Sequence, residues 1–585
     1  MTIMEAQVKI CQNCQKEFVI EPDDFGFYEK IKVPPPTFCP DCRLQRRLMF
    51  RNERTFYKRK CDLCAEDIIA SYPADAPFPV YCIKCWWSDK WDPTSYGQDF
   101  DFSRPFFEQF KELFYRVPVI ALMNDDGIAS INCQYNYDFA FNKNCYLCAC
   151  GWYNENVLYS ANANHNKDTV DCYTTHNSEL CYECALCEKC YGCSHCVRCS
   201  DSVNCIFGFD LRGCSNCVMC IGLRSKQYCI LNEQHSKEEY EQKIKEMKLE
   251  DRNNLQKYKK QFQEFSLRFP RKYAQFVNCV KSTGDMLVNC KMSKNCFYFN
   301  DLENCRYMVM NDGAKDCHDC NNTGHPALCY EAVTPDNSYG CIATIFCWKC
   351  NKAEYSNNCH SSNNLFGCSA LRTSEYAILN KKYSKQEYLA LREKIIAHMR
   401  ERGEWGEFFP GTLSPFAYNE TSAYDWFRLN KEEALMKKYK WKDEEERNYQ
   451  ISLVADKVPA EIAKVQDSII DEVLGCEHQG KCEEKCTTAF KITLRELQFY
   501  QRTNTPLPTL CPNCRFYQRS ENVNLPHLWK RKCGCAGAES ENNLYKNTKE
   551  HFHGAAECRE EFETSYAPDK PEIVYCEKCY QAEVY

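Results

Sequence analysis

The sequence lacks the features that mark secreted and membrane-spanning chains. Its first ten residues, MTIMEAQVKI, contain neither a basic segment nor an apolar run, and no stretch of 18 apolar residues occurs in the 585 residues. These absences predict a chain with no signal peptide and no membrane contact, and therefore a cytoplasmic, reducing location. In such a compartment, clustered cysteines more often bind metal or stay as buried thiols than form disulfides.

Signatures of common enzyme classes are missing as well. The sequence has no P-loop, no glycine-rich dinucleotide pattern, no H-E-x-x-H and no G-x-S-x-G. Its formal net charge of −7 argues against nonspecific nucleic-acid binding by the whole molecule. We therefore name no catalytic residue and no small-molecule substrate, and we interpret the chain as a binding or scaffold module rather than an enzyme.

Cysteine is abundant, with 47 residues, and near the N-terminus it occurs in C-x2-C pairs. Two such pairs supply the four thiolates of a closed, tetrahedral structural zinc site. A small β unit with few apolar residues cannot fold on burial alone, and bound zinc contributes about 10–16 kcal/mol to such folds. The sequence therefore predicts two N-terminal Zn²⁺ sites, one formed by Cys11, Cys14, Cys39 and Cys42 and the other by Cys61, Cys64, Cys82 and Cys85.

The C-terminal end repeats this plan. FYEKIKVPPPTFCPDCR at 27–43 returns as FYQRTNTPLPTLCPNCR at 499–515, and SYPADAPFPVYCIKC at 71–85 returns as SYAPDKPEIVYCEKC at 565–579. In the last ribbon, an insertion carrying His551 and His553 splits the first cysteine pair. Cys476 and Cys535 are spare, and Cys476 competes with Cys482 as a ligand. The predicted ligands of the third and fourth Zn²⁺ are Cys482, Cys486, Cys511 and Cys514, and Cys533, Cys558, Cys576 and Cys579.

These motifs resemble a known group of proteins. The pattern C-x2-C-x3-F…F-Y…P-x2-C-x2-C-R is similar to probable zinc-ribbon modules of many bacterial proteins. The whole layout resembles an uncharacterised bacterial family of multi-zinc-ribbon, cysteine-repeat proteins. The match is carried by CWWSDKWD…DFDFSRPFFEQFKEL (85–113), SPFAYNET (414–421) and CEHQGKC…CTTAF (476–490). The resemblance implies zinc ribbons at both ends, and it implies no activity.

Between the two ends, cysteines recur at every third residue. Every cysteine from Cys133 to Cys229 except Cys150 falls in one phase, and every cysteine from Cys290 to Cys368 falls in one phase, with Cys279 outside it. The other residues in these phases are uncharged except Lys226, whereas lysines, glutamates and arginines occupy the remaining positions. A cluster of metal-binding thiolates would not require leucine or alanine at the same positions of the period as cysteine. A row of side chains that all point into one apolar core would require it.

A period of three fits neither a helix nor an ordinary strand. Packed polyproline II helices need far more glycine than the 21 present. We therefore predict a mainly β chain with two tandem, cysteine-rich β-solenoids whose cores hold cysteine as a small apolar side chain. Disulfides, or a metal or iron–sulfur cluster, are the open alternatives. Asparagine tolerates left-handed corners, and it precedes core positions at Asn132, Asn144, Asn204, Asn216, Asn289, Asn295, Asn304 and Asn358.

The two arrays are copies of each other. CIGLRSKQYCILNEQHSKEEY (220–240) aligns with CSALRTSEYAILNKKYSKQEY (368–388), and each copy ends in a capping box that begins at Ser236 or Ser384. The predicted organisation is zinc ribbons at 1–55 and 56–100, an aromatic linker and cap helix at 101–130, a solenoid at 131–235, a helix at 236–272, a solenoid at 273–383, a helix at 384–403, a linker with a charged helix (KWKDEEER) at 404–475, and zinc ribbons at 476–525 and 526–585.

A basic, aromatic stretch, RLQRRLMFRNERTFYKRK (43–60), directly follows the first zinc ligands. Basic side chains for phosphates and aromatic rings for unstacked bases are typical of RNA recognition. The alternative is that these charges balance the −2 of a four-thiolate zinc site. The candidate contacts to RNA or the ribosome are Arg43, Arg46, Arg47, Arg51, Arg54 and Lys58. A scaffold that binds protein partners through solenoid faces, and a zinc or thiol store, are the other hypotheses for function.

Overall fold

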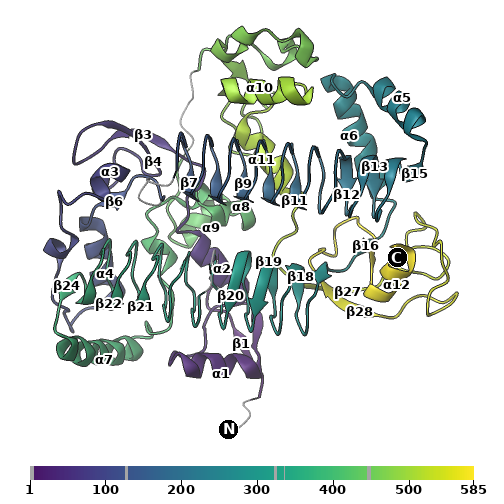
Figure 1. Ribbon diagram of the computed structural model, residues 1–585. Coiled ribbons are helices and arrows are strands. Elements are labelled where there is room, and N and C mark those ends of the chain that lie inside the picture. The colour runs from purple at the N-terminus through teal and green to yellow at the C-terminus, as the bar shows by residue number, and fades with distance from the viewer. Residues whose placement is uncertain are drawn as a thin grey trace. The chain divides into compact units, whose positions relative to one another are not determined.

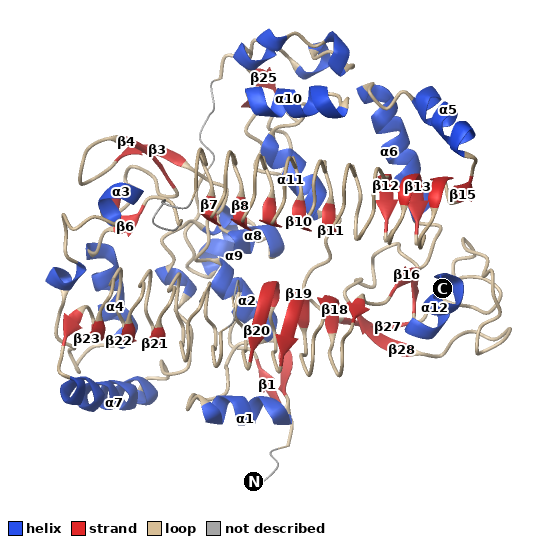
Figure 2. Ribbon diagram, in the orientation of Figure 1, coloured by secondary structure: helices blue, strands red, loops and turns tan. Residues whose placement is uncertain are grey.

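The structure is a computed structural model that describes residues 5–124, 130–321, 324, 326–334, 336–443 and 449–584. It contains 24% helix and 26% strand, arranged in many small sheets (Figure 2). The prediction of a mainly β chain is therefore corrected to a mixed one. The fold class was inferred from the cysteine pattern, which covers only the middle of the chain. Much of the helix lies outside it, in the ribbons and in segments between the arrays.

The chain forms two compact units. Unit 1 comprises Met1–Leu122, Ala274–Asp443 and Leu525–Leu528, and unit 2 comprises Met123–Tyr273, Glu444–Asn524 and Trp529–Tyr585. Each unit therefore combines one cysteine array with the ribbons from the distant end of the chain: the N-terminal ribbons join the second array, and the C-terminal ribbons join the first.

Both arrays wind into stacks of parallel coils, in which a residue pairs with the residue twelve positions later, as Gln134 pairs with Tyr146 and Lys291 with Glu303. We call the described residues of 131–232 the first stack and those of 275–380 the second stack (Figure 1). The strands of the first stack are β7 (Tyr137–Ala140), β8 (Ala149–Trp152), β9 (Ala161–Asn164), β10 (Tyr173–His176), β11 (Ala185–Glu188), β12 (Ile206–Phe209), β13 (Ser215–Ile221) and β14 (Gln227–Ile230), with β15 (Glu233–Gln234) antiparallel at the end. Those of the second stack are β17 (Phe276–Val277), β18 (Gly284–Val288), β19 (Cys296–Glu303), β20 (Val309–Lys315), β21 (Asn351–Glu354), β22 (Asn363–Phe366) and β23 (Glu375–Ile378), with β24 (Lys381–Lys382) antiparallel at the end.

A three-residue step explains the cysteine period. In each step one residue pairs with the neighbouring coils, the next has a positive φ, and the third is buried, as in Gln134, Tyr135 (φ 56°) and Asn136. The left-handed residue turns the chain, so that every third side chain points into the same core. All eight asparagines predicted at corners have positive φ, between 51° and 58°.

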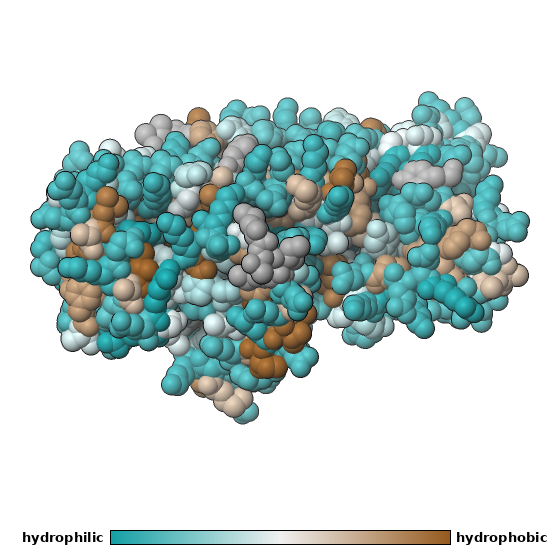
Figure 3. Space-filling view, turned by 90° about the horizontal axis from the view of Figure 1, so that it is seen from below, coloured by the Kyte–Doolittle hydropathy of each residue, from teal (hydrophilic) through white to brown (hydrophobic). Residues whose placement is uncertain are grey.

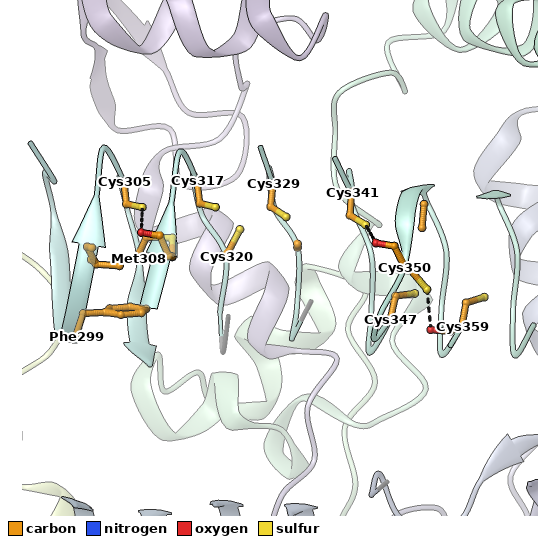
Figure 4. Close-up of a cluster of buried hydrophobic side chains, with 14 of the residues drawn as sticks. Phe299, Cys305, Met308, Cys317, Cys320, Cys329, Cys341, Cys347, Cys350 and Cys359 are labelled. Atoms are coloured by element: carbon orange, nitrogen blue, oxygen red, sulfur yellow. Dashed lines mark hydrogen bonds between the residues drawn. The ribbon is translucent and has the colours of Figure 1, made fainter. Parts of the chain in front are cut away.

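The inward cysteines of neighbouring coils form rows. Cys305, Cys317, Cys329 and Cys341 lie at the same level on successive coils (Figure 4), and each is fully buried. Their thiols lie beside carbonyl oxygens of the next coil: Cys341 Sγ is 3.5 Å from the oxygen of Cys350. A carbonyl oxygen can only accept a hydrogen bond, so this geometry favours the neutral S–H form.

Burial acts in the same direction on the ionisation of these thiols. It raises the pKa of Cys341 and Cys368 in the second stack, and of Cys148 in the first, to about 12. Hydrogen bonds from neighbouring thiols act the other way and lower the pKa of Cys329 and Cys190 to about 6. Every cysteine of the chain is free of disulfides. The stacks therefore hold cysteine as a small, buried side chain without disulfides, which is the packing role that the sequence favoured for the middle of the chain.

Each stack is followed by a helix that begins at a predicted capping box. Ser236 Oγ accepts a hydrogen bond from the backbone of Glu239 at 3.2 Å, and Ser384 Oγ accepts one from Glu387 at 3.3 Å. These helices are α5 (Lys237–Met247), which is followed by α6 (Arg252–Ser266), and α7 (Lys385–Glu401). Tyr388, Ile395 and Met399 form the buried face of α7.

The ribbons consist of antiparallel hairpins and short helices. The hairpins pair β1 (Gln7–Ile10) with β2 (Glu17–Ile20), β3 (Tyr57–Lys60) with β4 (Asp67–Ala70), β25 (Leu474–Gly475) with β26 (Ala489–Phe490), and β27 (Trp529–Lys532) with β28 (Glu561–Thr564). The helices are α1 (Pro22–Lys30), α2 (Pro40–Leu48), α3 (Ile83–Trp86), α10 (Leu494–Thr503), α11 (Pro512–Ser520) and α12 (Glu577–Val584). Two short parallel pairs tie a ribbon to the chain before a stack: β5 (Val80–Tyr81) with β6 (Val119–Ile120), and β29 (Val574–Tyr575) with β16 (Arg271–Lys272).

The region predicted as a linker contains buried aromatic residues. Phe408, Phe409 and Tyr418 are almost fully buried, and the aromatic helix α4 (Phe106–Arg116) packs Phe106 against Phe366 of the second stack. Part of the predicted charged helix, residues 444–447, lies outside the described residues. The remaining elements are α8 (Ser422–Trp426), α9 (Lys431–Met436), η1 (Pro93–Tyr96), η2 (Gly411–Leu413), η3 (Tyr418–Glu420), η4 (Ala455–Lys457), η5 (Ile462–Lys464) and η6 (Asp467–Asp471).

Candidate metal centres

Four groups of cysteines gather in the ribbons, each with sulfur atoms within 4.8 Å of one another. Around a tetrahedral ion at a Zn–S distance of about 2.3 Å, the sulfur atoms lie ~3.8 Å apart. The Sγ separations of 3.8 Å between Cys14 and Cys39 and of 3.9 Å between Cys558 and Cys576 match this value. The groups are Cys11, Cys14, Cys39 and Cys42; Cys61, Cys64, Cys82 and Cys85; Cys476, Cys486, Cys511 and Cys514; and Cys533, Cys558, Cys576 and Cys579.

The four groups share part of their local structure. In the first two groups a hairpin turn brings the first two cysteines together, and left-handed residues after the C-x2-C pairs, Gln15 and Ala65, complete the turn. In the last two groups the first two cysteines lie further apart along the chain. The second pair begins a helix, whose first residue after Cys39 is Pro40. The backbone N–H at the start of that helix donates to the first sulfur of the site, at 3.3 Å from Cys39 to Cys11 Sγ. Such N–H···S bonds stabilise a thiolate and orient it toward an ion.

The ionisation of the first two groups fits metal ligands. The hydrogen bond from the Cys42 thiol lowers the pKa of Cys39 to about 5. Burial alone would raise the pKa of Cys61, but hydrogen bonds from the backbone N–H groups of Cys64 and Cys82 outweigh it and lower the pKa to about 7. Because a metal binds the thiolate and not the thiol, the environments of Cys39 and Cys61 favour coordination. The pKa values of Cys14, Cys42, Cys82 and Cys85 are raised above the ordinary value.

The third group differs from its predicted ligand set. It includes Cys476 together with the predicted Cys486, Cys511 and Cys514, while Cys482 Sγ lies 3.7 Å from Cys514 Sγ as a fifth sulfur. Cys476 accepts the backbone N–H of Cys511 at 3.2 Å, just as Cys11 accepts that of Cys39. Both Cys11 and Cys476 directly follow a strand, β1 or β25. The position directly after a strand therefore identifies Cys476 as the counterpart of Cys11, which the cysteine spacing alone did not.

The six candidate nucleic-acid contacts do not form an exposed surface. Arg43, Arg46, Arg47 and Arg51 are only 1%, 6%, 0% and 2% exposed. Among the six, Lys58 is exposed and Arg54 is half-buried. Four of the predicted contacts are thus inaccessible to a phosphate backbone, and this part of the prediction is corrected.

The buried arginines dock the first ribbon onto the second stack. Arg43 and Arg47, one turn apart on α2, lie 2.9 and 3.2 Å from the two carboxylate oxygens of Asp319. Arg46 pairs with Glu331 at 2.5 Å and with Glu407 at 3.0 Å. A local sequence cannot show this outcome, because each acidic partner lies hundreds of residues away along the chain.

Unit 2 contains an equivalent contact between a ribbon and a stack. We call each of these two buried ribbon–stack contacts a dock. Arg515 and Arg519 of α11 lie 2.7 and 2.8 Å from Asp171 in the first stack. Asp171 and Asp319 are 148 residues apart, which is also the offset between the two arrays, from Cys220 to Cys368. The second ribbon–stack contact therefore uses the equivalent carboxylate and the equivalent arginines.

Tyrosines complete both docks in the same way. Tyr307 donates to Asp24 at 2.8 Å in unit 1, and Tyr159 donates to Glu496 at 2.8 Å in unit 2. Burial raises the pKa of Glu496 above its ordinary value. The acidic and aromatic groups of the docks therefore serve packing between ribbon and stack.

A search of protein-family models and of curated proteins found no match to the chain. Among the residues that the structure describes, no helix is long and apolar enough to cross a membrane. The case for a function therefore rests on the cysteine groups, the docks and the exposed surface of the stacks.

Proposed function

We propose that the protein is a zinc-stabilised scaffold, in which four structural Zn²⁺ ions shape ribbons that clamp two β-solenoids. The observation that carries this proposal is the position of the docking arginine directly after a metal ligand: Arg43 follows Cys42, and Arg515 follows Cys514. Zinc suits such four-thiolate sets, because it takes tetrahedral sulfur ligation without redox chemistry. An ion at either site would fix the start of the helix that carries the docking arginines.

Closed four-thiolate sites support a structural role over a catalytic one, because they leave no open coordination position for a substrate. The thiols of the stacks support the same role and argue against a thiol store, since they are buried in the cores of the stacks. We place the protein in the cytoplasm, where a reducing environment keeps such thiols free.

A protein partner fits the surface of the first stack. Phe141, Tyr153 and His165, on successive coils, form a stacked row with ring centroids 5.1 and 4.9 Å apart. Phe141 and Tyr153 are 50% and 54% exposed. The face drawn in Figure 3 is mostly hydrophilic, with small separate hydrophobic patches. A row of exposed rings supports binding of a partner with aromatic or apolar side chains, which are enriched at protein interfaces.

The test measures zinc and docking together in the full chain. We expect at least four ions, one in each four-cysteine site, and we expect chelation to open the segments around Arg43 and Arg515 to hydrogen exchange. A chain that binds no zinc, or whose docks stay protected after complete removal of zinc, would contradict the proposal.

A second arm tests RNA with the same protein. Binding through about six phosphate contacts would weaken on the order of a thousandfold between 50 and 200 mM salt. We expect no such binding, because the arginines that would make most of the contacts are buried. Salt-sensitive RNA binding that is lost in an Arg54→Gln/Lys58→Gln variant would replace the protein-scaffold proposal by the nucleic-acid one.

A further inference from the structure

The last ribbon contains a second group of metal-ligand side chains. In the N-terminal counterpart two residues separate Cys61 from Cys64, whereas residues 534–557 separate Cys533 from Cys558. This insertion carries Cys535, His551 and His553. The structure folds all three back against Cys579, with the ligand atoms of the four residues within 4.8 Å of one another.

The distances within this group are compatible with a tetrahedral ligand set. Cys535 Sγ lies 3.2 Å from His551 Nδ1, and His553 Nε2 lies 3.3 Å from Cys579 Sγ. Two thiolates and two imidazoles form one of the standard structural zinc sites. Cys535, His551 and Cys579 are buried, and His553 is half-buried.

A carboxylate holds His551 in the orientation that ligation needs. His551 Nε2 lies 2.8 Å from Glu583 Oε1, and both side chains are fully buried. A proton on Nε2 satisfies this contact and leaves Nδ1 with its lone pair toward Cys535. Carboxylate–histidine pairs of this kind orient metal ligands and make the imidazole a better donor.

Glu583 also anchors the insertion. Its carboxylate accepts the backbone N–H groups of Thr548 and Lys549 at 2.8 and 3.2 Å. Glu583 lies on α12, the helix that contains Cys579. One helix therefore supplies a ligand and fixes the loop that supplies the other three.

We propose that the last ribbon binds two zinc ions that share the Cys579 thiolate. This inference rests on the proposed zinc-binding function and adds a fifth ion to it. A four-thiolate Zn²⁺ site carries a charge of −2. The second ion would add one further thiolate and two neutral imidazoles, so the pair would carry −1. Sharing Cys579 thus lowers the negative charge that this ribbon has to bury.

The experiment is native mass spectrometry of the full-length protein after saturation with zinc and desalting, with circular dichroism as a check on folding. We expect five ions in the wild type and four in the His551→Asn/His553→Asn variant, which leaves the four-cysteine site intact. Four ions in both proteins would overturn the inference and leave the four-site proposal standing. Fewer than four in the wild type would overturn the proposed function itself.

A matched pair of cysteine variants tests the sharing. Cys85 is the counterpart of Cys579 in the N-terminal ribbon, where the structure groups it with Cys61, Cys64 and Cys82. We expect Cys85→Ser to lose one ion and Cys579→Ser to lose two. Cobalt substitution provides a second readout, because the mixed thiolate–imidazole spectrum should vanish in the histidine variant. Loss of a single ion from Cys579→Ser would show that the two sites do not share this thiolate.

Discussion

The two units dock ribbon and stack in the same way, but they present different surfaces. Arg43 and Arg47 meet Asp319 in unit 1, and Arg515 and Arg519 meet Asp171 in unit 2. Tyr28 packs edge-on against Tyr330, with ring centroids 5.3 Å apart, as Tyr500 does against Tyr182 at 5.7 Å. Removing the carboxylate would leave the arginines buried without a countercharge, which costs several kcal/mol of folding free energy. This cost is a physical reason for both copies of the repeat to retain the contact.

The exposed rows of the stacks do not match. The positions 148 residues after Phe141 and Tyr153 are Asn289 and Asp301. In the second stack Asn289 donates to Asp301 at 3.0 Å, which makes a polar row where the first stack has an aromatic one. An exposed side chain contributes little to folding, so these positions can differ between copies and can serve binding.

The largest expected effects concern the metal, and they should differ between the units. We expect Cys11→Ser to lose one ion and with it about 10–16 kcal/mol of metal-binding free energy in its ribbon. Cys476→Ser should keep its ion, because Cys482 Sγ lies 3.7 Å from Cys514 Sγ and can take the open position. Native mass spectrometry measures both.

The double variant Cys476→Ser/Cys482→Ser is the control for this difference. It should lose the ion that either single variant retains. Loss of the ion from Cys476→Ser alone would show that the fifth sulfur cannot act as a ligand, and the two units would then respond alike.

The next largest effects are expected from removing the charge of the docking carboxylates, Asp319 and Asp171. Here the two units should behave alike. Asp319→Asn leaves Arg43 and Arg47 buried without a full countercharge, and Asp171→Asn does the same to Arg515 and Arg519. We expect each to lower the free energy of unfolding by about 3–5 kcal/mol. Urea denaturation of the zinc-loaded protein measures the change.

Asp67→Asn is the matched surface control for the docking variants. Its ion pair with Lys60 is exposed, so the loss should be at most about 1 kcal/mol. Equal effects of Asp319→Asn and Asp67→Asn would show that the dock is not a buried ion pair in solution.

Alkaline pH should weaken both stacks through their thiols. Cys148 and Cys341 have a pKa of about 12 in the folded protein, against an ordinary value of about 9. The unfolded chain therefore loses these protons first, so the stability contributed by the neutral thiols is complete below pH 9 and falls between pH 9 and 12. The slope is up to about 1.4 kcal/mol per pH unit for each thiol.

Unfolding free energies at pH 8, 9 and 10 measure this slope. Cys341→Ala should reduce it by one thiol, and Cys148→Ala should reduce it equally in the first stack. A slope that neither variant changes would assign the alkaline loss to other groups.

The smallest effect on stability is expected where the stacks differ. Phe141→Ser/Tyr153→Ser should change the free energy of unfolding by about 0.5 kcal/mol or less per site, because these rings are half exposed. The variant should weaken binding to a partner while Asn289→Ser/Asp301→Ser leaves it unchanged. Thermal denaturation and co-purification with cell protein, compared between the two variants, test this contrast.

Local sequence was enough to predict the coil pattern and most members of the four cysteine groups. The period of three follows from a left-handed residue in every step, and asparagines such as Asn132 and Asn358 mark those corners in the sequence itself. The first two cysteine groups follow from C-x2-C spacing, because two cysteines on one turn and two at a helix start meet by local geometry. The fourth group was predicted from the repeated sequence instead, because an insertion separates Cys533 from Cys558. Cys476 was missed, since its distance from Cys486 differs from that between Cys11 and Cys14.

What the sequence determined by itself is therefore local: the coil step, the buried cysteine core, the capping boxes and the cysteine pairs. Only the tertiary structure decided which ribbon meets which stack, that Arg43 and Arg47 are buried against Asp319, and that Cys535, His551 and His553 reach Cys579. The physical reason is distance along the chain. Local patterns depend on neighbouring residues, whereas Arg43 and Asp319 are 276 positions apart, and their contact depends on two separately folded surfaces that bury charge against charge.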